Sequence, residues 1–176
     1  MAWTAPMTAV AGSVFTAAQF NTFIRDNLNE CPAAKATTPG SIFATTATNQ
    51  IAERIPQTAT VATSQTTTSA TYTDLATTGP AVTVTTGSTA LVSLYNANLN
   101  SSATVSSLMS YDVTGASSVA ASDATAIGNA TANGTRETGT FLQTGLTSGS
   151  NTFTCRYRVG SGTGTFVDRK IIVVPF

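Results

Sequence analysis

The residue types that most often carry enzyme chemistry are sparse in this sequence. Histidine is absent from the 176 residues, so neither a Ser-His-Asp nor a Cys-His arrangement can form, and the usual imidazole general base is missing. Neither Lys35 nor Lys170 has a serine three residues before it, which removes the Ser-x-x-Lys nucleophile as well. The sequence therefore predicts a protein that is not an enzyme and has no catalytic residue.

Paired carboxylates are the remaining route to catalysis, as in enzymes that cleave polysaccharides. The eight acidic residues do not recur at a spacing that forces two of them together, and each fits a turn, a surface or an ion pair. Asp112 and Asp123 are the two whose replacement by Asn would test for such an activity. We expect no cleavage of polysaccharide.

Metal and phosphate sites also lack their usual signatures. The two cysteines stand far apart, Cys31 at the end of an expected helix and Cys155 within an expected strand, without histidine or an Asp-rich calcium loop. We interpret each cysteine as a small apolar residue and not as half of a disulfide. The glycine run at 160–164 joins two expected strands, which is typical of a hairpin turn and not of a phosphate loop. We expect no metal and no cofactor.

The composition favours strands that display hydroxyl groups. Only 9% of the residues are charged, against about 25% in an average soluble domain, whereas 36 residues are Thr. Threonine is β-branched and suits a pleated, half-exposed surface. Eight basic and eight acidic residues cancel, and the basic residues form no extended stripe, so we expect no nucleic-acid partner.

The start of the chain does not resemble a targeting segment. The first 24 residues contain no Lys or Arg, which a secretory signal needs before its apolar stretch. No window approaches the roughly 18 apolar residues of a membrane span. We expect synthesis in the cytosol and no membrane span, so we interpret the sequons at Asn100, Asn129 and Asn133 as chance matches.

A helix is predicted over about residues 17–30. Thr16 can cap its first turn, and Gln19 stands at the position that completes a capping box. Phe15 and Phe20 occupy the two positions of a hydrophobic staple. An isolated helix of this length is marginal in water, so this one must pack against something.

Two partners for the helix are open: its own domain, or another subunit into which it inserts together with Trp3. The pattern favours neither, because an apolar stripe on a helix is often ordinary core. The residues that we expect to attach this segment to a partner are Trp3, Phe15, Phe20, Phe23, Ile24 and Leu28.

The chain is expected to divide into an anchor at 1–57 and a domain at 58–176. Residues 32–69 contain three prolines and a Thr-rich tract, which we interpret as an extended connector without a core of its own.

From about residue 70, short apolar runs alternate with Gly, Asn and Ser turns. This pattern is typical of a sandwich or barrel. The expected fold is mainly β, a roughly eight-stranded antiparallel sandwich preceded by an α-helix and an extended arm. The expected strands are 71–76, 81–86, 89–96, 103–113, 117–127, 136–144, 151–159 and 165–174.

The last expected strand has apolar residues on both faces. Residues 171–174 read Ile-Ile-Val-Val, so one face should pack in the domain's own core and the other needs a second cover. That cover is either a second copy of the chain or the domain's own connector.

The N-terminal stretch resembles segments of structural proteins from phages and prophages of actinobacteria. The resemblance is carried by Ala-Trp3-Thr-Ala-Pro6-Met-Thr-Ala-Val, by Phe20-Asn21 and by Arg25-Asp26-Asn27-Leu28.

Two further stretches resemble the C1q/TNF-like jelly-roll domain of such phage proteins, over about residues 58–176. They are Tyr72-Thr-Asp74-Leu75 with Gly79-Pro80-Ala-Val82-Thr-Val84, and Asn151-Thr-Phe153-Thr with Tyr157-Arg158, Gly162-Thr-Gly164-Thr-Phe166 and Arg169-Lys170-Ile171-Ile172-Val173-Val174-Pro175.

This resemblance implies a homotrimer with strand faces buried between subunits, attached to other virion proteins through its N-terminal segment and displayed on the virion surface. A capsid decoration or short head fibre is the expected role, because about 56 residues of anchor give little length for a tail fibre. The trimer-interface candidates are Tyr157, Phe166, Ile171, Ile172, Val173 and Val174.

The alternative role is a minor tail protein that recognises a glycan on the host surface. Tyr72, Tyr95 and Tyr111 are the candidate stacking platforms for such a ligand. Packing in the core is the ordinary alternative for each of these tyrosines.

Overall fold

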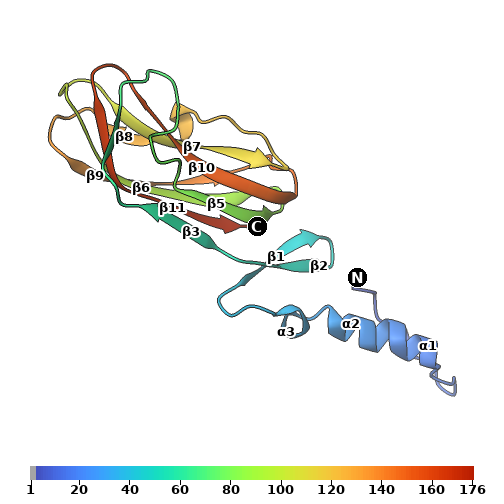
Figure 1. Cartoon of the computed structure of the whole chain (residues 1–176). Coiled ribbons are helices and arrows are strands. Elements are labelled where there is room, and N and C mark those ends of the chain that lie inside the picture. The colour runs from blue at the N-terminus through green and yellow to red at the C-terminus, as the bar shows by residue number, and fades with distance from the viewer. Residues whose placement is uncertain (1–2) are drawn as a thin grey trace. The chain divides into compact units, whose positions relative to one another are not determined.

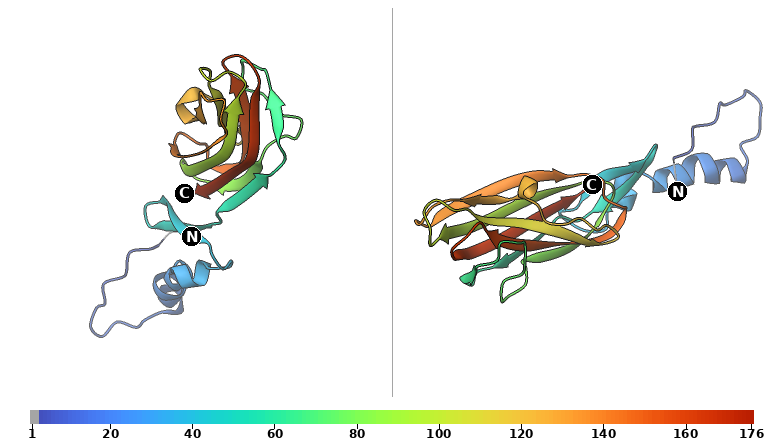
Figure 2. Two further views of the ribbon diagram at one scale, coloured as in Figure 1. Left: turned by 90° about the vertical axis from the view of Figure 1, so that its left-hand side faces the viewer. Right: turned by 90° about the horizontal axis from the view of Figure 1, so that it is seen from above.

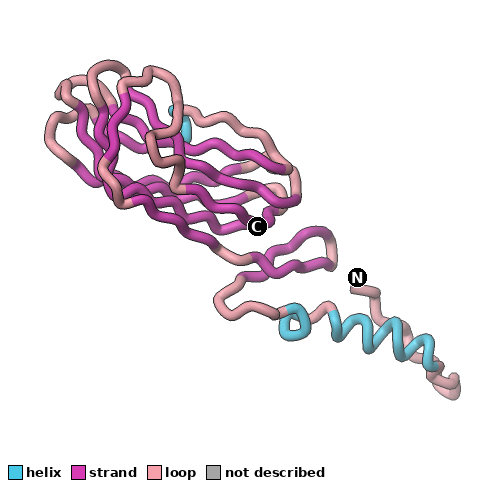
Figure 3. Tube along the Cα trace, in the orientation of Figure 1, coloured by secondary structure: helices cyan, strands magenta, loops and turns pink. Residues whose placement is uncertain are grey.

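The computed structural model describes residues 3–176, which form two compact units. The first unit ends at Ile55 and the second spans Pro56–Pro175. Helices and a hairpin make up the first unit, whereas the second consists of strands and one short helical turn (Figures 1 and 3). Within the described residues, no helix is long and apolar enough to cross a membrane.

Continuous helical backbone runs through the segment in which a helix was predicted. The Gln19 amide donates to Thr16 Oγ1 over 3.2 Å, and the Thr16 amide donates to Gln19 Oε1 over 2.9 Å. The Phe15 and Phe20 rings meet edge-on with centroids 6.2 Å apart, so both the capping box and the staple are confirmed. The helical pieces are α1 (Ala17–Phe20), the π-helical η1 (Asn21–Arg25), α2 (Asp26–Asn29) and a separate α3 (Pro32–Lys35).

The prediction of an extended connector at 32–69 is wrong for about half of its length, which forms strands. Ile42–Ala47 (β1) and Gln50–Arg54 (β2) pair as an antiparallel hairpin in the first unit. Asn49 adopts a φ of 58° in the turn, a conformation that asparagine tolerates better than most residues. Two further strands, Gln57–Val61 (β3) and Gln65–Thr67 (β4), pair with the last strand of the second unit.

The second unit is a sandwich of two antiparallel sheets, which face each other in Figure 2. In chain order from β4, the eight strands change sheet at every step except from β7 to β8, which is the arrangement of a jelly roll. One sheet has the order β5-β10-β7-β8, and the other has the order β3-β11-β6-β9 with β4 also paired to β11. The remaining strands are β5 (Ala81–Thr86), β6 (Ala90–Asn100), β7 (Ser107–Gly115), β8 (Ile127–Asn129), β9 (Thr135–Gln143), β10 (Gly149–Val159) and β11 (Gly164–Pro175).

The core of the sandwich follows from alternation along the strands. In β10, Phe153, Tyr157 and Val159 lie on one face of the strand and are all buried. Phe153 packs 6.0 Å from Tyr111 on the neighbouring strand β7, measured between ring centroids.

The sequence prediction is wrong for two of the expected strands. Residues 117–127 are mostly loop with a 3₁₀ turn (η2, Asp123–Thr125), and residues 71–76 form only an isolated bridge between Thr73 and Tyr157.

Strand β11 is interrupted by a bulge. Its register against β6 shifts between Val167 and Lys170, and Asp168 there has a φ of 50°. The extra residue turns Arg169 inward, where the guanidinium is fully buried. Arg169 Nη2 donates to the Thr63 carbonyl over 3.3 Å and to Gln65 Oε1 over 3.0 Å. Arg169 therefore ties the segment between β3 and β4 to the bulge.

Candidate functional site

The first unit exposes most of the residues that were expected to attach it to a partner. Phe20, Ile24 and Leu28 follow one another at a spacing of four, so they share one side of the helical segment. Their exposed fractions, with those of Trp3 and Phe15, lie between 38% and 60%, whereas Phe23 is half-buried.

Asn27 holds the N-terminal segment beside the helix. Its side chain is buried, with Nδ2 donating to the Thr4 carbonyl over 2.9 Å and Oδ1 accepting from the Thr4 amide over 2.8 Å. The Trp3 amide donates to the Asn49 carbonyl over 3.1 Å. These bonds position Trp3 between the helix and the hairpin. The sequence analysis did not predict this role for Asn27.

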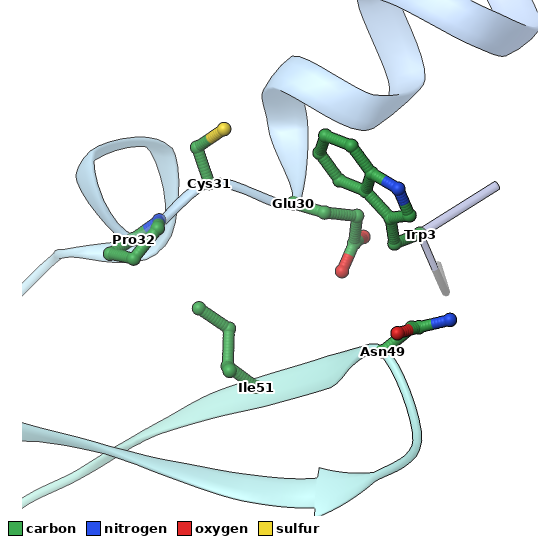
Figure 4. Close-up of a pocket in the computed structure, with 6 residues that line it drawn as sticks. All are labelled: Trp3, Glu30, Cys31, Pro32, Asn49 and Ile51. Carbon is green, nitrogen blue, oxygen red and sulfur yellow. The ribbon is translucent and has the colours of Figure 1, made fainter. Parts of the chain in front are cut away.

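A hollow of about 380 Å³ lies beside Trp3. In Figure 4, the indole of Trp3 and the carboxylate of Glu30 lie on the helix side, while Ile51 points into the hollow from the hairpin. Lys35 Nζ lies 2.8 Å from Glu30 Oε2, and this hydrogen bond lowers the pKa of the Glu30 carboxyl. The hollow adds an apolar recess to the exposed helical surface.

The first unit has almost no apolar core of its own. Ala44 is its one buried hydrophobic residue among those that the structure describes; all the others lie in the second unit. Polar contacts organise the hairpin instead: Glu53 accepts hydrogen bonds from Ser41, Thr37 and the Thr38 amide, which lower the pKa of Glu53 to about 2.

The predicted trimer-interface residues, Tyr157 on β10 and the other five on β11, fall into two groups by the face on which each side chain lies. Tyr157, Phe166, Ile171 and Val173 are fully buried inside their own sandwich, so no second copy of the folded domain can reach them. This corrects the sequence-based assignment, which ignored the face on which each side chain lies. Ile172 and Val174 lie on the outer face of β11, with Ile172 exposed and Val174 half-buried.

Neighbouring strands extend the apolar surface around Val174. Val174 pairs in register with Leu91 of β6, and Leu91 pairs with Leu142 of β9. Leu142 is 61% exposed. One row of apolar side chains therefore crosses the outer face of the five-stranded sheet.

A charged cluster lies on the outer face of the other sheet. Arg156 of β10 donates from Nε to Asp112 Oδ2 of β7 over 2.7 Å, and its Nη1 pairs with Asp74 Oδ2. The Oδ1 atoms of Asp74 and Asp112 are buried without a hydrogen-bond partner among the described residues. Arg156 therefore holds each carboxylate by one oxygen, while the other oxygen is shielded from solvent.

A second cluster lies on the same sheet. The Tyr72 hydroxyl donates to Asp123 Oδ1 over 2.9 Å, and Arg158 Nε donates to the same oxygen over 2.9 Å. The Arg158 guanidinium carbon lies 5.5 Å from the centroid of the Tyr72 ring. The hydrogen bond from Arg158 lowers the pKa of Asp123, while burial raises the pKa of Tyr72.

A hollow of about 360 Å³ brings the first cluster and Tyr72 together. It combines an aromatic ring, two carboxylates, one guanidinium and two alanines, a set that can receive a ligand with several hydrogen-bond donors. The sequence does not reveal this grouping, because it depends on strand register and on how two loops cross the sheet. Its lining consists of Tyr72, Thr73, Asp74, Asp112, Ala120, Ala121 and Arg156.

The three candidate stacking tyrosines have different environments. Tyr111 is in the core, where its hydroxyl donates to Gln143 Oε1 over 3.0 Å and burial raises its pKa to about 12, so it cannot serve as a platform. Tyr95 is half-buried, with the Arg136 guanidinium 5.8 Å from its ring centroid. Only Tyr72 of the three lines the hollow described above.

Neither cysteine forms a disulfide in the described part of the chain; Cys155 is buried and Cys31 half-buried. Residues 3–176 contain no group of three His, Cys, Asp or Glu side chains that could hold a metal ion.

No protein-family model matches the chain, and no curated protein matches it. Among solved structures, Eiger TNF from S. frugiperda is similar with a TM-score of 0.48 and 12% identity, over 70% of this chain and 92% of that chain. The structure of the infectious bursal disease virus Gx strain is similar with a TM-score of 0.44 and 9% identity, over 80% of this chain and 36% of that chain. The assignment as a jelly roll rests on the strand order described above.

Proposed function

We propose that this chain is a non-enzymatic structural protein of a bacteriophage virion. Its first unit attaches to other virion proteins, and its sandwich is displayed on the particle surface as a homotrimer. The role is that of a capsid decoration or a short head fibre.

The proposal rests on the exposure of apolar side chains in the first unit. Among its described residues, Ala44 alone is a buried hydrophobic residue, whereas Trp3, Phe20 and Leu28 are exposed. Apolar area removed from water contributes about 25 cal/mol per Å², so a partner that covers this surface would stabilise the unit. The resemblance of the same segment to phage structural proteins supports a virion component as that partner.

Trimer formation is supported by the apolar row on the outer face of the five-stranded sheet. Leu142 and Ile172 are exposed there, and Leu91 and Val174 continue the row between their strands. An apolar patch on one face of a sheet is suited to burial against further copies of the same chain.

Attachment can be tested with virions produced without this chain, to which the purified full-length protein is added back. Ile24→Asp places a charge on the exposed stripe and should abolish co-sedimentation with the particles. Thr22→Asp is the matched control, because Thr22 is also exposed on the helical segment but lies outside the stripe. Equal binding of the two variants would contradict attachment through this surface.

Trimer formation can be tested by size-exclusion chromatography with light scattering on the full-length protein. Leu142→Asp should convert a trimer into a monomer, whereas Thr83→Asp, on the outer face of the other sheet, should leave it trimeric. A wild-type protein that runs as a monomer would overturn this part of the proposal.

A minor tail protein that recognises a host glycan is the second candidate. The hollow beside Tyr72 favours it, because an aromatic ring and charged side chains line the same recess. Labelling the chain in intact virions and locating it by electron microscopy separates the candidates: label on the head supports a decoration or head fibre, and label on the tail supports this alternative.

A further inference from the structure

Asn133 lies in the loop between β8 and β9, and it is the one asparagine of the sequence that is followed by glycine. We propose that Asn133 and Gly134 form a site of spontaneous deamidation, at which Asn133 is converted into aspartate or isoaspartate in the folded protein. This modification concerns the sandwich alone and does not depend on a role in a virion.

The two groups that react are accessible and not held by other groups. Asn133 and Gly134 are both exposed. Among the described residues, neither the side-chain amide of Asn133 nor the backbone amide of Gly134 makes a hydrogen bond. The backbone amide of Asn133 is the group that is bonded, since it donates to Thr131 Oγ1 over 3.1 Å. No hydrogen bond of the reacting groups therefore has to break before they meet.

Gly134 allows the close approach that the reaction requires. It lies outside regular structure, because β8 ends at Asn129 and β9 begins at Thr135. Glycine has no Cβ and adopts a wider range of backbone conformations than any other residue, so its nitrogen can turn toward Cγ of Asn133.

Asn49 provides a comparison within the same chain. It is also exposed and lies in a turn, but the next residue is Gln50, which carries a side chain and pairs with Ala47 in the hairpin. The nitrogen of Gln50 is therefore less free to approach the side chain of Asn49.

The chemistry needs water and no other reactant. The Gly134 backbone nitrogen loses its proton and attacks Cγ of Asn133, and the bond from Cγ to Nδ2 breaks as Nδ2 leaves as ammonia. Water then opens the resulting cyclic imide. Opening at Cγ restores the normal backbone with an aspartate, whereas opening at the main-chain carbonyl gives isoaspartate, in which the backbone runs through Cγ.

The product should keep the sandwich fold and change its charge. Residue 133 precedes Thr135, the first residue of β9, which pairs with Asn98 of β6. Strand pairing is therefore not interrupted. The formal net charge of the chain is zero, so each modified copy becomes negative and can be separated from unmodified copies.

The experiment is incubation of the purified full-length protein at mildly alkaline pH, followed by anion-exchange chromatography and peptide mass spectrometry. A more acidic species should accumulate, and the replacement of an amide by an acid should map to Asn133. Its rate of formation should rise with pH, because the attacking nitrogen must lose its proton. Loss of Asn133 that is no faster than loss of Asn49, or that does not depend on pH, would overturn the proposal.

Gly134→Ala tests the role of the glycine. A Cβ at this position would lie 3.8 Å from Leu99 Cδ2, which is an ordinary contact, and Gly134 does not have a positive φ. The variant should therefore fold. It should slow the loss of Asn133 about fivefold or more, because alanine restricts the backbone.

Two further variants complete the test. Ala132→Ser changes an exposed neighbour without touching the reacting bonds and should deaminate at the wild-type rate at Asn133. Asn133→Gln places the amide one methylene further from the Gly134 nitrogen and should remove the acidic species, whatever the folding of Gly134→Ala. An acidic species that persists in Asn133→Gln at the wild-type rate would assign the modification to another residue.

Discussion

The two units of this chain bury apolar surface to very different extents. In the second unit, long strands alternate cleanly, and side chains such as Val92, Phe153 and Ile171 are fully buried. In the first unit, Ala44 alone is a buried hydrophobic residue among those described, and polar groups such as Asn27 and Glu53 make many of the contacts. The second unit therefore has a core of its own, whereas the first leaves large apolar side chains exposed.

This contrast leads to separate expectations for mutations in the two units. A core substitution in the sandwich should change the free energy of unfolding, because no partner can compensate for the cavity. A substitution on the exposed stripe of the first unit should change association and leave the unfolding of the sandwich as it was.

The largest effect is expected from Phe153→Ala. Phe153 is fully buried beside Tyr111, so its truncation should destabilise the sandwich by about 3–5 kcal/mol. Urea unfolding followed by near-ultraviolet circular dichroism measures this loss. Phe20→Ala is the counterpart in the first unit; it should weaken attachment to the particle and leave the urea midpoint of the sandwich unchanged. Comparable loss of sandwich stability in both variants would contradict the contrast between the units.

A smaller loss is expected from Asn151→Ala, also in the sandwich. The buried Asn151 side chain accepts from the Ser117 amide over 2.8 Å and donates to Thr86 Oγ1 over 2.8 Å. Removing it leaves the Ser117 amide without its acceptor and the Thr86 hydroxyl without its donor, which should cost about 2–3 kcal/mol. Urea unfolding gives the value, and Asn133→Ala at an exposed position serves as the control. A loss no greater than that of the control would show that the hydrogen bonds are replaced by water.

Acid should loosen the first unit through Glu53. Its pKa is lowered from 4.5 to about 2 by the hydroxyls of Ser41 and Thr37 and by the Thr38 amide. Because the folded pKa lies below the unfolded value, the stabilisation is complete above about pH 4.5 and is lost as the pH falls toward 2. The NMR signal of the Thr38 amide should follow that titration in the wild type. In Glu53→Gln the signal should no longer change over this pH range. A transition that persists unchanged in the variant would assign it to another group.

The smallest effect is expected at the start of the helical segment. Thr16→Ala removes the oxygen that accepts the Gln19 amide and should cost about 1 kcal/mol of helix stability. Faster hydrogen exchange of the Phe20 amide, which donates to the Thr16 carbonyl, would report the fraying. Thr22→Ala, outside the cap, should leave the exchange rate close to that of the wild type. Exchange in β10 should not change in either variant.

The sequence predicts the parts of the fold whose signal is local. The capping residues Thr16 and Gln19 mark the helix start, and alternation marks β5, β7 and β10. The strands β3 and β4 escaped prediction because they are short, polar and stabilised by pairing with β11 at a distant point in the chain. The hairpin β1-β2 had a usable signal in Asn49, which lies in a two-residue turn.

Prediction of the candidate sites requires more information about contacts between distant parts of the sequence. The exposed stripe on the helix followed from spacing alone, since Phe20, Ile24 and Leu28 recur every four residues. The hollow in the sandwich did not, because Asp74 and Asp112 meet only through Arg156 on a third segment. The interface assignment failed at Tyr157 because alternation along β10 places this residue on the inward face with Phe153 and Val159. In β11, the bulge shifts the inward-facing positions by one residue.

The bulge in β11 also affects how a further strand could pair with the margin of its sheet. It separates the half of the strand that pairs with β4 from the half that pairs with β3, so two short strands cover this margin of the sheet where one long strand would otherwise run. Short, interrupted margins offer a poor template for a foreign strand. Pairing with a strand from another molecule is therefore disfavoured at this margin of the sheet.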